Sequence, residues 1–221
     1  MGLALTADAL VFDLDGTLVD TTRIIDTIWR QWSAEYGRVA EQVVKAAKGR
    51  QTIETLRDFA PPGMDLEAEA RRLQMQARAA TTGAVAIAGA EAFLSQIPSD
   101  RWAIVTSAER ELAERWLMQA GLPVPSVLIS AGDVARSKPD PEGYLLAASR
   151  LAVAAGEMLV FEDSMAGLTA ATRAGARCVQ IGGEAKLGGD ANVVVRIEDY
   201  LEAKLVAEPP RAEMEIVLAT A

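Results

Sequence analysis

The sequence contains no histidine, and its only cysteine is Cys178. The lack of histidine excludes Ser-His-Asp triads, histidine-ligated zinc sites and histidine general bases. A single cysteine excludes a framework of disulfides within the chain. The sequence also lacks an apolar run long enough to span a bilayer, and it does not begin with a basic region followed by an apolar stretch. We therefore expect a soluble, cytoplasmic protein.

Positive charge is also scarce, because 22 Lys and Arg residues stand against 31 Asp and Glu residues, for a formal net charge of −9. Nucleic acids and anionic membranes need a basic surface, so neither is an expected partner. Apolar residues are abundant and make up 50% of the 221 positions. This length and composition suit one domain with an insertion and a sizeable core. We expect a monomer or a weak homodimer.

The most informative stretch lies near the start, where an apolar run over residues 9–12 is typical of a buried strand. Two carboxylates, Asp13 and Asp15, follow directly, and Gly16 comes next. Residues two apart in an extended strand point to the same side, so both carboxylates can face the space beyond the strand, where ligands bind in open α/β sheets. Two neighbouring acids repel each other unless a cation or a shared proton relieves them. The pair therefore indicates a site at which the protein carries out a chemical function.

The rest of the sequence divides into a helical part and an alternating part. Residues 20–36 have apolar side chains at helical spacing, and further helices are expected over 39–46, 52–59 and 65–80, with no strand between 20 and 88. Beyond residue 88, strands are expected over 102–106, 127–130, 159–161 and 178–181, with helices over 109–120, 141–152 and 165–174. Such alternation predicts a mostly parallel sheet with right-handed crossovers.

These elements predict an α/β fold, namely a doubly wound, mostly parallel, Rossmann-like sheet with an inserted all-helical cap. We expect the core domain over residues 1–19 and 86–221 and the cap over 20–85. Residues 193–195 are expected to form a short sixth strand, whereas 213–219 alternate weakly and suit either an edge strand or a tail. The glycine pairs at 182–183 and 188–189 lack the strand–turn–helix context of a dinucleotide site and are expected to be loops.

Four motifs in order give the chain a resemblance to a known superfamily. Asp13-Leu14-Asp15-Gly16-Thr17 resembles the first motif of the haloacid dehalogenase-like (HAD) hydrolases. The other three follow at expected strand ends: Val105-Thr106-Ser107, Lys138-Pro139-Asp140-Pro141 and Phe161-Glu162-Asp163-Ser164. The helical insert between the first two motifs resembles the cap of the β-phosphoglucomutase-like branch. The resemblance covers nearly the whole chain and implies a HAD-like fold.

The first motif suits a two-step phosphoryl transfer. Phosphate monoesters are among the slowest substrates to hydrolyse without a catalyst, so an enzyme must lower the barrier by about 20 kcal/mol or more. A carboxylate nucleophile divides the reaction into two easier displacements through an aspartyl-phosphate, and we assign this role to Asp13. Asp15 is then the general acid for the leaving alcohol and the general base for water. True haloacid dehalogenases do not need this second aspartate, so its presence favours phosphoryl transfer.

A cation is expected beside the nucleophile. A carboxylate and a phosphate dianion repel each other, and Mg²⁺ bound by one or two carboxylates and the substrate phosphate relieves this repulsion. Asp13 and Asp163 are the candidate side-chain ligands. The resemblance adds the backbone carbonyl of Asp15, and Glu162 could assist directly or through water.

The second and third motifs supply groups for the phosphate. Lys138 provides a fixed positive charge for the nucleophile and the transferring group. Thr106 can donate a hydrogen bond to a phosphate oxygen through its hydroxyl. The backbone N–H groups of Ser107 and Ala108, at an expected helix start, suit an anion.

The cap carries the best indication of the substrate. Residues 48–59 resemble the cap loop of small sugar- and polyol-phosphate phosphatases, among them glycerol-phosphate, 2-deoxyglucose-phosphate and hexitol-phosphate phosphatases. Several of those have histidine where this chain has Lys48. Lys48, Gly49 and Arg50 are therefore candidate substrate-binding residues, although the two cations could equally be solvated cap charges. We expect a Mg²⁺-dependent phosphatase of small sugar or polyol phosphates. A phosphomutase and an inert binding or regulatory protein on the same fold are the alternatives.

Three of the motifs also have a purely structural interpretation. Asp13 and Asp15 could simply end a strand, Lys138-Pro139 could be a loop, and Asp163 or Ser164 could cap a helix. The phosphoryl interpretation is favoured because the candidate residues all fall at strand ends on one face of one sheet. Several other residues are expected to be structural: Asp20, Asp133 and Asp140 in turns or caps, Trp29 and Trp32 in the cap core, and Cys178 as a small buried residue.

Overall fold

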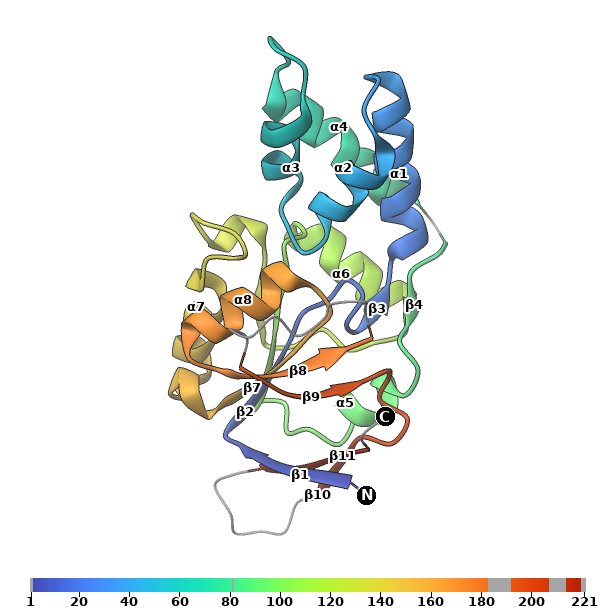
Figure 1. Cartoon of the computed structure of the whole chain (residues 1–221). Helices are drawn as coiled ribbons and strands as arrows, with labels where there is room; N and C mark the ends of the chain where they lie inside the picture. Colours follow the sequence, from blue (N-terminus) through green and yellow to red (C-terminus); the bar gives the residue numbers. More distant parts are fainter. Residues whose placement is uncertain (1, 81, 183–191, 207–213, 220–221) are drawn as a thin grey trace.

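The centre of the protein is a six-stranded sheet in the order β6-β5-β2-β7-β8-β9 (Figure 1). The computed structural model describes residues 2–80, 82–182, 192–206 and 214–219. Every neighbouring pair of strands in this sheet is parallel, which confirms the predicted fold class. The strands are β2 Ala9–Phe12, β5 Trp102–Val105, β6 Val127–Ile129, β7 Met158–Glu162, β8 Arg177–Ile181 and β9 Val193–Ile197.

Helices cover both faces of the sheet, because alternate residues of a strand point to opposite sides. Leu10 and Phe12 of β2 belong to one buried cluster, which also contains residues of the helices over 90–94 and 110–119. Val11 belongs to a second buried cluster on the other face, which contains residues of the helices over 142–151 and 165–174. The carboxyl end of β2 is therefore fixed at the middle of a packed layer. The four helices are α5 Ala90–Leu94 and α6 Arg110–Gln119 on the first face, and α7 Glu142–Leu151 and α8 Met165–Ala174 on the second.

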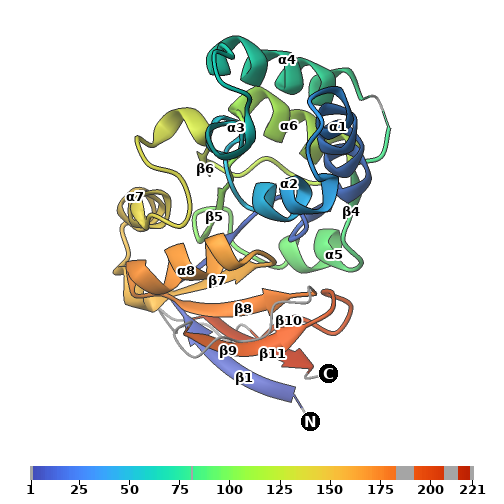
Figure 2. The same cartoon turned by 45° about the horizontal axis from the view of Figure 1, so that its top comes forward.

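Four more helices stand together above the sheet at one end of the molecule (Figures 1 and 2). They correspond to the four helical segments expected between residues 20 and 80. The Trp32 indole N–H donates a 2.9 Å hydrogen bond to Glu69, and both side chains are buried. Trp29 is also buried, so the two tryptophans lie in the cap core as predicted. The helices are α1 Thr22–Glu35, α2 Ala40–Ala47, α3 Thr52–Phe59 and α4 Leu66–Ala79.

Two short strands connect the cap helices to the sheet. β3 Val19–Asp20 pairs antiparallel with β4 Val85–Ala86. The prediction of no strand between residues 20 and 88 is therefore wrong. Each strand has only two residues, which is too short for a periodic pattern, and the pairing arises because both linkers cross between the same two parts of the fold.

A separate three-stranded antiparallel sheet, in the order β1-β11-β10, brings together the two ends of the chain. Its strands are β1 Gly2–Ala7, β10 Lys204–Val206 and β11 Met214–Ala219. β11 is the central strand, so the predicted edge strand or tail at 213–219 is wrong for the described residues 214–219. Ile216 and Leu218 explain the difference, because both are fully buried against the core. β1, like α5, was not expected from the sequence pattern.

The remaining predictions for the C-terminal part have mixed outcomes. β9 is the predicted short sixth strand and forms one edge of the parallel sheet. The glycine positions 183 and 188–189 lie outside the described residues. Within the described ranges, no helix is both long enough and apolar enough to cross a membrane.

Candidate active site

The predicted motif residues meet at the carboxyl ends of three adjacent strands. Asp13 follows β2, Thr106 follows β5, and Glu162 ends β7, and these strands are neighbours in the order β5-β2-β7. The backbone N–H of Asp13 donates a 3.0 Å hydrogen bond to the carbonyl of Phe161, so the sheet itself aligns the first and fourth motifs. Lys138 reaches the same place from the segment between β6 and α7.

Lys138 joins two of the carboxylates. Its Nζ lies 2.6 Å from Asp13 Oδ1 and 2.5 Å from Glu162 Oε1, and it also donates to the carbonyl of Val105 at 3.0 Å. All three charged side chains are buried. Burial by itself lowers the pKa of Lys138, but the two facing carboxylates outweigh this effect and raise it, so the ammonium stays charged. Lys138 is therefore a fixed cation in contact with the candidate nucleophile.

Glu162 holds this cation in place. Its Oε1 also accepts a 2.9 Å hydrogen bond from the Tyr144 hydroxyl. Its Oε2 accepts from the backbone N–H and the hydroxyl of Ser164, each at 3.0 Å. Gly167 is needed beside it, because a Cβ at that position would lie 1.6 Å from Glu162 Oε1. The structure thus gives Glu162 a positioning role, whereas its predicted assistance to a metal stays a prediction.

Asp15 points to a different set of partners. The Thr21 hydroxyl donates a 2.7 Å hydrogen bond to Asp15 Oδ1, and the Thr106 hydroxyl approaches Oδ2 at 3.4 Å. Burial raises the pKa of Asp15 to about 6, although the hydrogen bond from Thr21 opposes this change. A carboxyl with such a pKa can both release and take up a proton near neutral pH. The two paired aspartates therefore have distinct environments.

A cation would fit beside Asp13. Oxygens of Asp13, Glu162 and Asp163 lie within 4.8 Å of one another. Burial, together with the charge of Glu162, raises the pKa of Asp163 to about 7, so these carboxylates repel each other. Gly16 has a φ of +83°, and a Cβ there would lie 2.3 Å from Asp163 Oδ2. The space for the Asp163 carboxylate thus depends on a glycine, and oxygen ligands of this kind suit Mg²⁺.

The predicted phosphate-binding groups lie beside this cluster. Thr106 Oγ1 accepts a 3.0 Å hydrogen bond from the backbone N–H of Ala108, so its hydroxyl hydrogen is directed elsewhere. The Ser107 hydroxyl donates a 2.8 Å hydrogen bond to the carbonyl of Gly49 in the cap. Residues 107 and 108 precede α6, which begins at Arg110. Their role in binding phosphate stays a prediction.

The cap loop closes over the site through contacts with several core segments. Gly49 has a φ of +71°, and a Cβ there would lie 2.2 Å from Ser164 Oγ. The Gln51 amide donates a 3.2 Å hydrogen bond to the carbonyl of Ala131. The Ser137 hydroxyl, next to Lys138, donates to Glu54 of α3. These contacts hold the cap against the core around the candidate catalytic groups.

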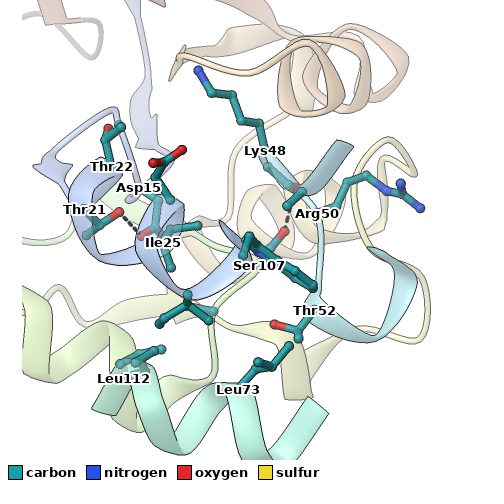
Figure 3. Close-up of a pocket in the computed structure, with 18 of the residues that line it drawn as sticks. Asp15, Thr21, Thr22, Ile25, Lys48, Arg50, Thr52, Leu73, Ser107 and Leu112 are labelled. Carbon is teal, nitrogen blue, oxygen red and sulfur yellow. Dashed lines mark hydrogen bonds between the residues drawn. The ribbon is translucent and has the colours of Figure 1, made fainter. Parts of the chain in front are cut away.

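The two cap cations differ in their surroundings. Arg50 Nη1 lies 2.8 Å from Asp58 Oδ2, and its guanidinium points away from the site (Figure 3). Lys48 is exposed, but it is close enough to Asp163 for its charge to lower the pKa of that carboxyl. Both residues line the cavity in front of the aspartates. Arg50 is thus already ion-paired, which favours its interpretation as an ordinary cap charge. Lys48 remains the better candidate for binding the substrate, because its charge acts on Asp163.

This cavity has a volume of about 160 Å³ and lies between the cap and the core. At the end that holds the candidate catalytic residues, it is lined by Asp13, Asp15, Gly16 and Asp163. Its other walls come from α1, α2, α4 and α6, from the start of α3, and from the loops after α2 and β5. A substrate with its phosphate at the aspartates would place its alcohol part in this space.

Sequence reasoning missed three residues that hydrogen-bond a candidate site residue or its chain neighbour: Thr21, Tyr144 and Glu54. Thr21 stands at the N-cap position of α1, yet its side chain makes no capping hydrogen bond because its hydroxyl binds Asp15. Tyr144 and Glu54 looked like ordinary helix residues, and only the fold brings them to Glu162 and Ser137. The nearness of Thr21 to the first motif in the sequence was the one available signal.

The residues predicted to lie in turns, in caps or in the core are found there. Asp20 Oδ1 accepts from the backbone N–H of Thr22, and Asp140 Oδ1 accepts from that of Glu142. Asp133 accepts from both the backbone and the hydroxyl of Ser130. Ser164 caps α8 through a 3.0 Å hydrogen bond from Gly167, as its alternative interpretation predicted. Cys178 is fully buried.

Comparison with known proteins agrees with this geometry. Residues 10–181 match the family described as haloacid dehalogenase-like hydrolase. The chain is 37% identical over 210 residues to hexitol phosphatase A of Escherichia coli K12, covering 93% of this chain and 97% of that protein. It is 31% identical over 193 residues to glycerol-1-phosphate phosphohydrolase 2 of Saccharomyces cerevisiae, covering 81% and 76%. A solved hydrolase from Pseudomonas syringae has a TM-score of 0.72 at 26% identity, covering 86% and 93%. The chain belongs to the haloacid dehalogenase-like hydrolase family.

Proposed function

We propose that this protein is a Mg²⁺-dependent phosphatase that hydrolyses phosphate monoesters of small sugars or polyols through an aspartyl-phosphate on Asp13. The observation that carries the proposal is the pair of unlike aspartates: Lys138 contacts Asp13, whereas Thr21 holds Asp15. The named sugar- and polyol-phosphate phosphatases among its relatives support the substrate class. The cavity between cap and core supports a small alcohol as the leaving group.

In the first step, a carboxylate oxygen of Asp13 attacks phosphorus while the bond from phosphorus to the alcohol oxygen breaks. Lys138 stays bound to Asp13 Oδ1 and offsets the negative charge that gathers around the transferring group. Asp15 gives its proton to the leaving alcohol. General acid catalysis of this kind is worth roughly 10²–10⁴-fold.

In the second step, water attacks the phosphorus of the aspartyl-phosphate. Asp15, now ionised, removes a proton from that water, and the bond from phosphorus to the Asp13 oxygen breaks. The products are inorganic phosphate and the regenerated carboxylate of Asp13. The cap over residues 20–85 is proposed to exclude bulk water and to enclose the alcohol.

Mg²⁺ would be held by the carboxylates of Asp13 and Asp163 and the backbone carbonyl of Asp15. When bound, it would offset the repulsion between these groups and the phosphate dianion. The clustered carboxylate oxygens and the glycine that makes room for Asp163 support this assignment.

The test is release of inorganic phosphate from glycerol, pentose, hexose and hexitol phosphates in the presence of Mg²⁺. We expect release by the wild type, loss of release with EDTA, and a fall of at least about 10³-fold for Asp13→Asn. Asp100→Asn, at an exposed aspartate, is the matched control and should leave the rate unchanged. Isomerised sugar phosphate without released phosphate would instead identify a mutase. A wild type as inactive as Asp13→Asn on every ester would support the binding-protein alternative.

A further inference from the structure

Tyr144 is a fully buried tyrosine of α7 whose hydroxyl and ring both face the ion pairs of the candidate active site. Its hydroxyl donates a 2.9 Å hydrogen bond to Glu162 Oε1, the same oxygen that lies 2.5 Å from Lys138 Nζ. The centre of its ring lies 5.3 Å from Lys138 Nζ, which is within the range of a cation–π attraction. One side chain therefore interacts with both members of this ion pair.

The packing of α7 fixes the position of Tyr144. Its ring belongs to the buried apolar cluster that also contains Val105 and Ile129. The preceding residue is Gly143, and a Cβ there would lie 2.9 Å from Val105 Cγ1, so the absence of a side chain lets α7 approach β5 closely. A phenylalanine at position 144 would fill the same space in this cluster. The hydroxyl is therefore not needed for packing, and its contact with Glu162 is what it adds.

The hydroxyl changes how Glu162 acts on the lysine. Lys138 Nζ lies between Glu162 Oε1 at 2.5 Å and Asp13 Oδ1 at 2.6 Å. A carboxylate oxygen that accepts two hydrogen bonds shares its negative charge between the two donors. The hydrogen bond from Tyr144 therefore weakens the attraction of Glu162 for the ammonium and fixes the direction of Oε1. As a result, the ammonium stays shared with Asp13 rather than moving wholly to Glu162.

The proposed reaction requires the lysine to keep this place. When Asp13 becomes the aspartyl-phosphate, its carboxylate loses its charge, and its attraction for Lys138 falls. The ammonium is then held by Glu162, by the carbonyl of Val105 at 3.0 Å and by the ring of Tyr144. It must still lie beside the phosphoryl group when water attacks, because negative charge gathers there again.

We infer that Tyr144 is a positioning residue, which keeps the Lys138 ammonium directed at Asp13 and at the transferring phosphoryl group through both steps of the reaction. This inference rests on the proposed phosphatase function and adds a residue to it. Tyr144 is not among the residues that line the cavity in front of the aspartates. It therefore acts through Glu162 and Lys138 rather than on the substrate.

Tyr144→Phe tests the inference, and Tyr200→Phe is the matched control. Tyr200 is 1% exposed and stacks on Phe93, but its hydroxyl has no hydrogen-bond partner among the described residues. For the best sugar or polyol phosphate of the phosphate-release screen, we expect Tyr144→Phe to lower kcat by at least about 10-fold and to change KM by less than about 2-fold. Tyr200→Phe should change neither value by more than about 2-fold. Urea denaturation checks that both variants are folded under the assay conditions.

The leaving group distinguishes Tyr144 from the residues around Asp15. Lys138 acts on the transferring group, so the loss of kcat in Tyr144→Phe should agree within about 3-fold between p-nitrophenyl phosphate and the sugar phosphate. A role in protonating the leaving alcohol would instead spare p-nitrophenyl phosphate, and that result would contradict the inference.

A double-variant cycle tests whether the effect passes through Glu162. In the Glu162→Gln background, Tyr144→Phe should lower kcat further by less than about 3-fold, because the charge that the hydroxyl directs is already gone. Orthovanadate, which takes the five-coordinate geometry of the transferring phosphoryl group, provides the same cycle without turnover. Its calorimetric dissociation constant should rise by at least about 10-fold in Tyr144→Phe and by less than about 3-fold when Tyr144→Phe is added to Glu162→Gln. A full loss in both backgrounds would overturn the route through Glu162.

The outcomes separate the two proposals. Phosphate release by the wild type, with the same kcat in Tyr144→Phe and Tyr200→Phe, would overturn the positioning role and leave the phosphatase proposal standing. A Tyr144→Phe variant that loses stability but keeps its kcat would do the same, because it would show a structural role only. Release from none of the esters by the wild type would overturn both. A loss of kcat that depends on Glu162 and not on the leaving group would support both.

Discussion

The hydroxyl of Thr21, the residue before the first cap helix, donates a 2.7 Å hydrogen bond to Oδ1 of Asp15. Thr21 is 2% exposed, so water cannot easily replace this bond. Thr21→Val keeps the shape of the side chain and removes the donor. We expect kcat to fall by about 10-fold for sugar phosphates, because Asp15 is no longer held for proton transfer.

Two comparisons isolate this effect. Thr21→Ser keeps the hydroxyl and should retain most of the activity. With p-nitrophenyl phosphate, whose leaving group needs little protonation, Thr21→Val should lose less than about 3-fold. An equal loss on both substrates would contradict a role for Thr21 that acts through the proton-transfer step.

Gly16 offers a direct test of the metal site. A Cβ at Gly16 would lie 2.3 Å from Asp163 Oδ2, whereas a Cβ at Gly37 would have no atom within 4 Å. Both glycines have positive φ values, +83° and +62°, so alanine should destabilise the fold at either site by about 1–2 kcal/mol. Only Gly16→Ala should raise the half-saturating Mg²⁺ concentration, by at least about 10-fold. Calorimetric Mg²⁺ titration and steady-state kinetics measure this, and equal Mg²⁺ dependence in the two variants would argue against Asp163 as a ligand.

Lys138 should also contribute to stability. Lys138→Met leaves the buried carboxylates of Asp13 and Glu162 without their cation, which should cost about 3–5 kcal/mol in free energy of unfolding, measured by urea denaturation in EDTA. Adding Glu162→Gln should restore about 1 kcal/mol or more, because one unpaired charge is removed. Arg136→Met, which breaks an exposed ion pair with Glu142, is the control and should cost at most about 1 kcal/mol. Strict additivity in the double variant would rule out the coupling.

Cys178 should be unreactive in the folded protein. Burial raises the pKa of its thiol to about 12 from the ordinary value of 9.0, so the nucleophilic thiolate is scarce at pH 8. Iodoacetamide should label the native protein at least about 100-fold more slowly than the unfolded chain. Because the unfolded thiol loses its proton near pH 9 and the folded one near pH 12, ionisation of Cys178 should lower stability as the pH rises through this window. Cys178→Ala should lack that part of the pH dependence.

The parallel sheet and the four cap helices were predictable because their strands and helices carry recognisable sequence patterns. Residues 9–12 form a continuous apolar run in a fully buried strand, and residues 22–35 repeat apolar side chains at helical spacing. β3 and β4 were not predictable, since two residues carry no period. β11 alternates only weakly, and its central place depends on β1 from the other end of the chain.

The sequence by itself determined the chemical groups and their order: paired aspartates after the first core strand, a lysine, and a Glu-Asp pair at the end of a later strand. Their local spacing fixes which residues can share a strand end, because strand geometry is the same wherever it occurs. Only the tertiary structure decided that Lys138 spans Asp13 and Glu162, that Thr21 holds Asp15, and that Arg50 turns to Asp58. It also decided that α1, α4 and α6 together line the cavity in front of the aspartates. These relationships depend on side chains distant in sequence, whose positions are set by packing between layers rather than by local pattern.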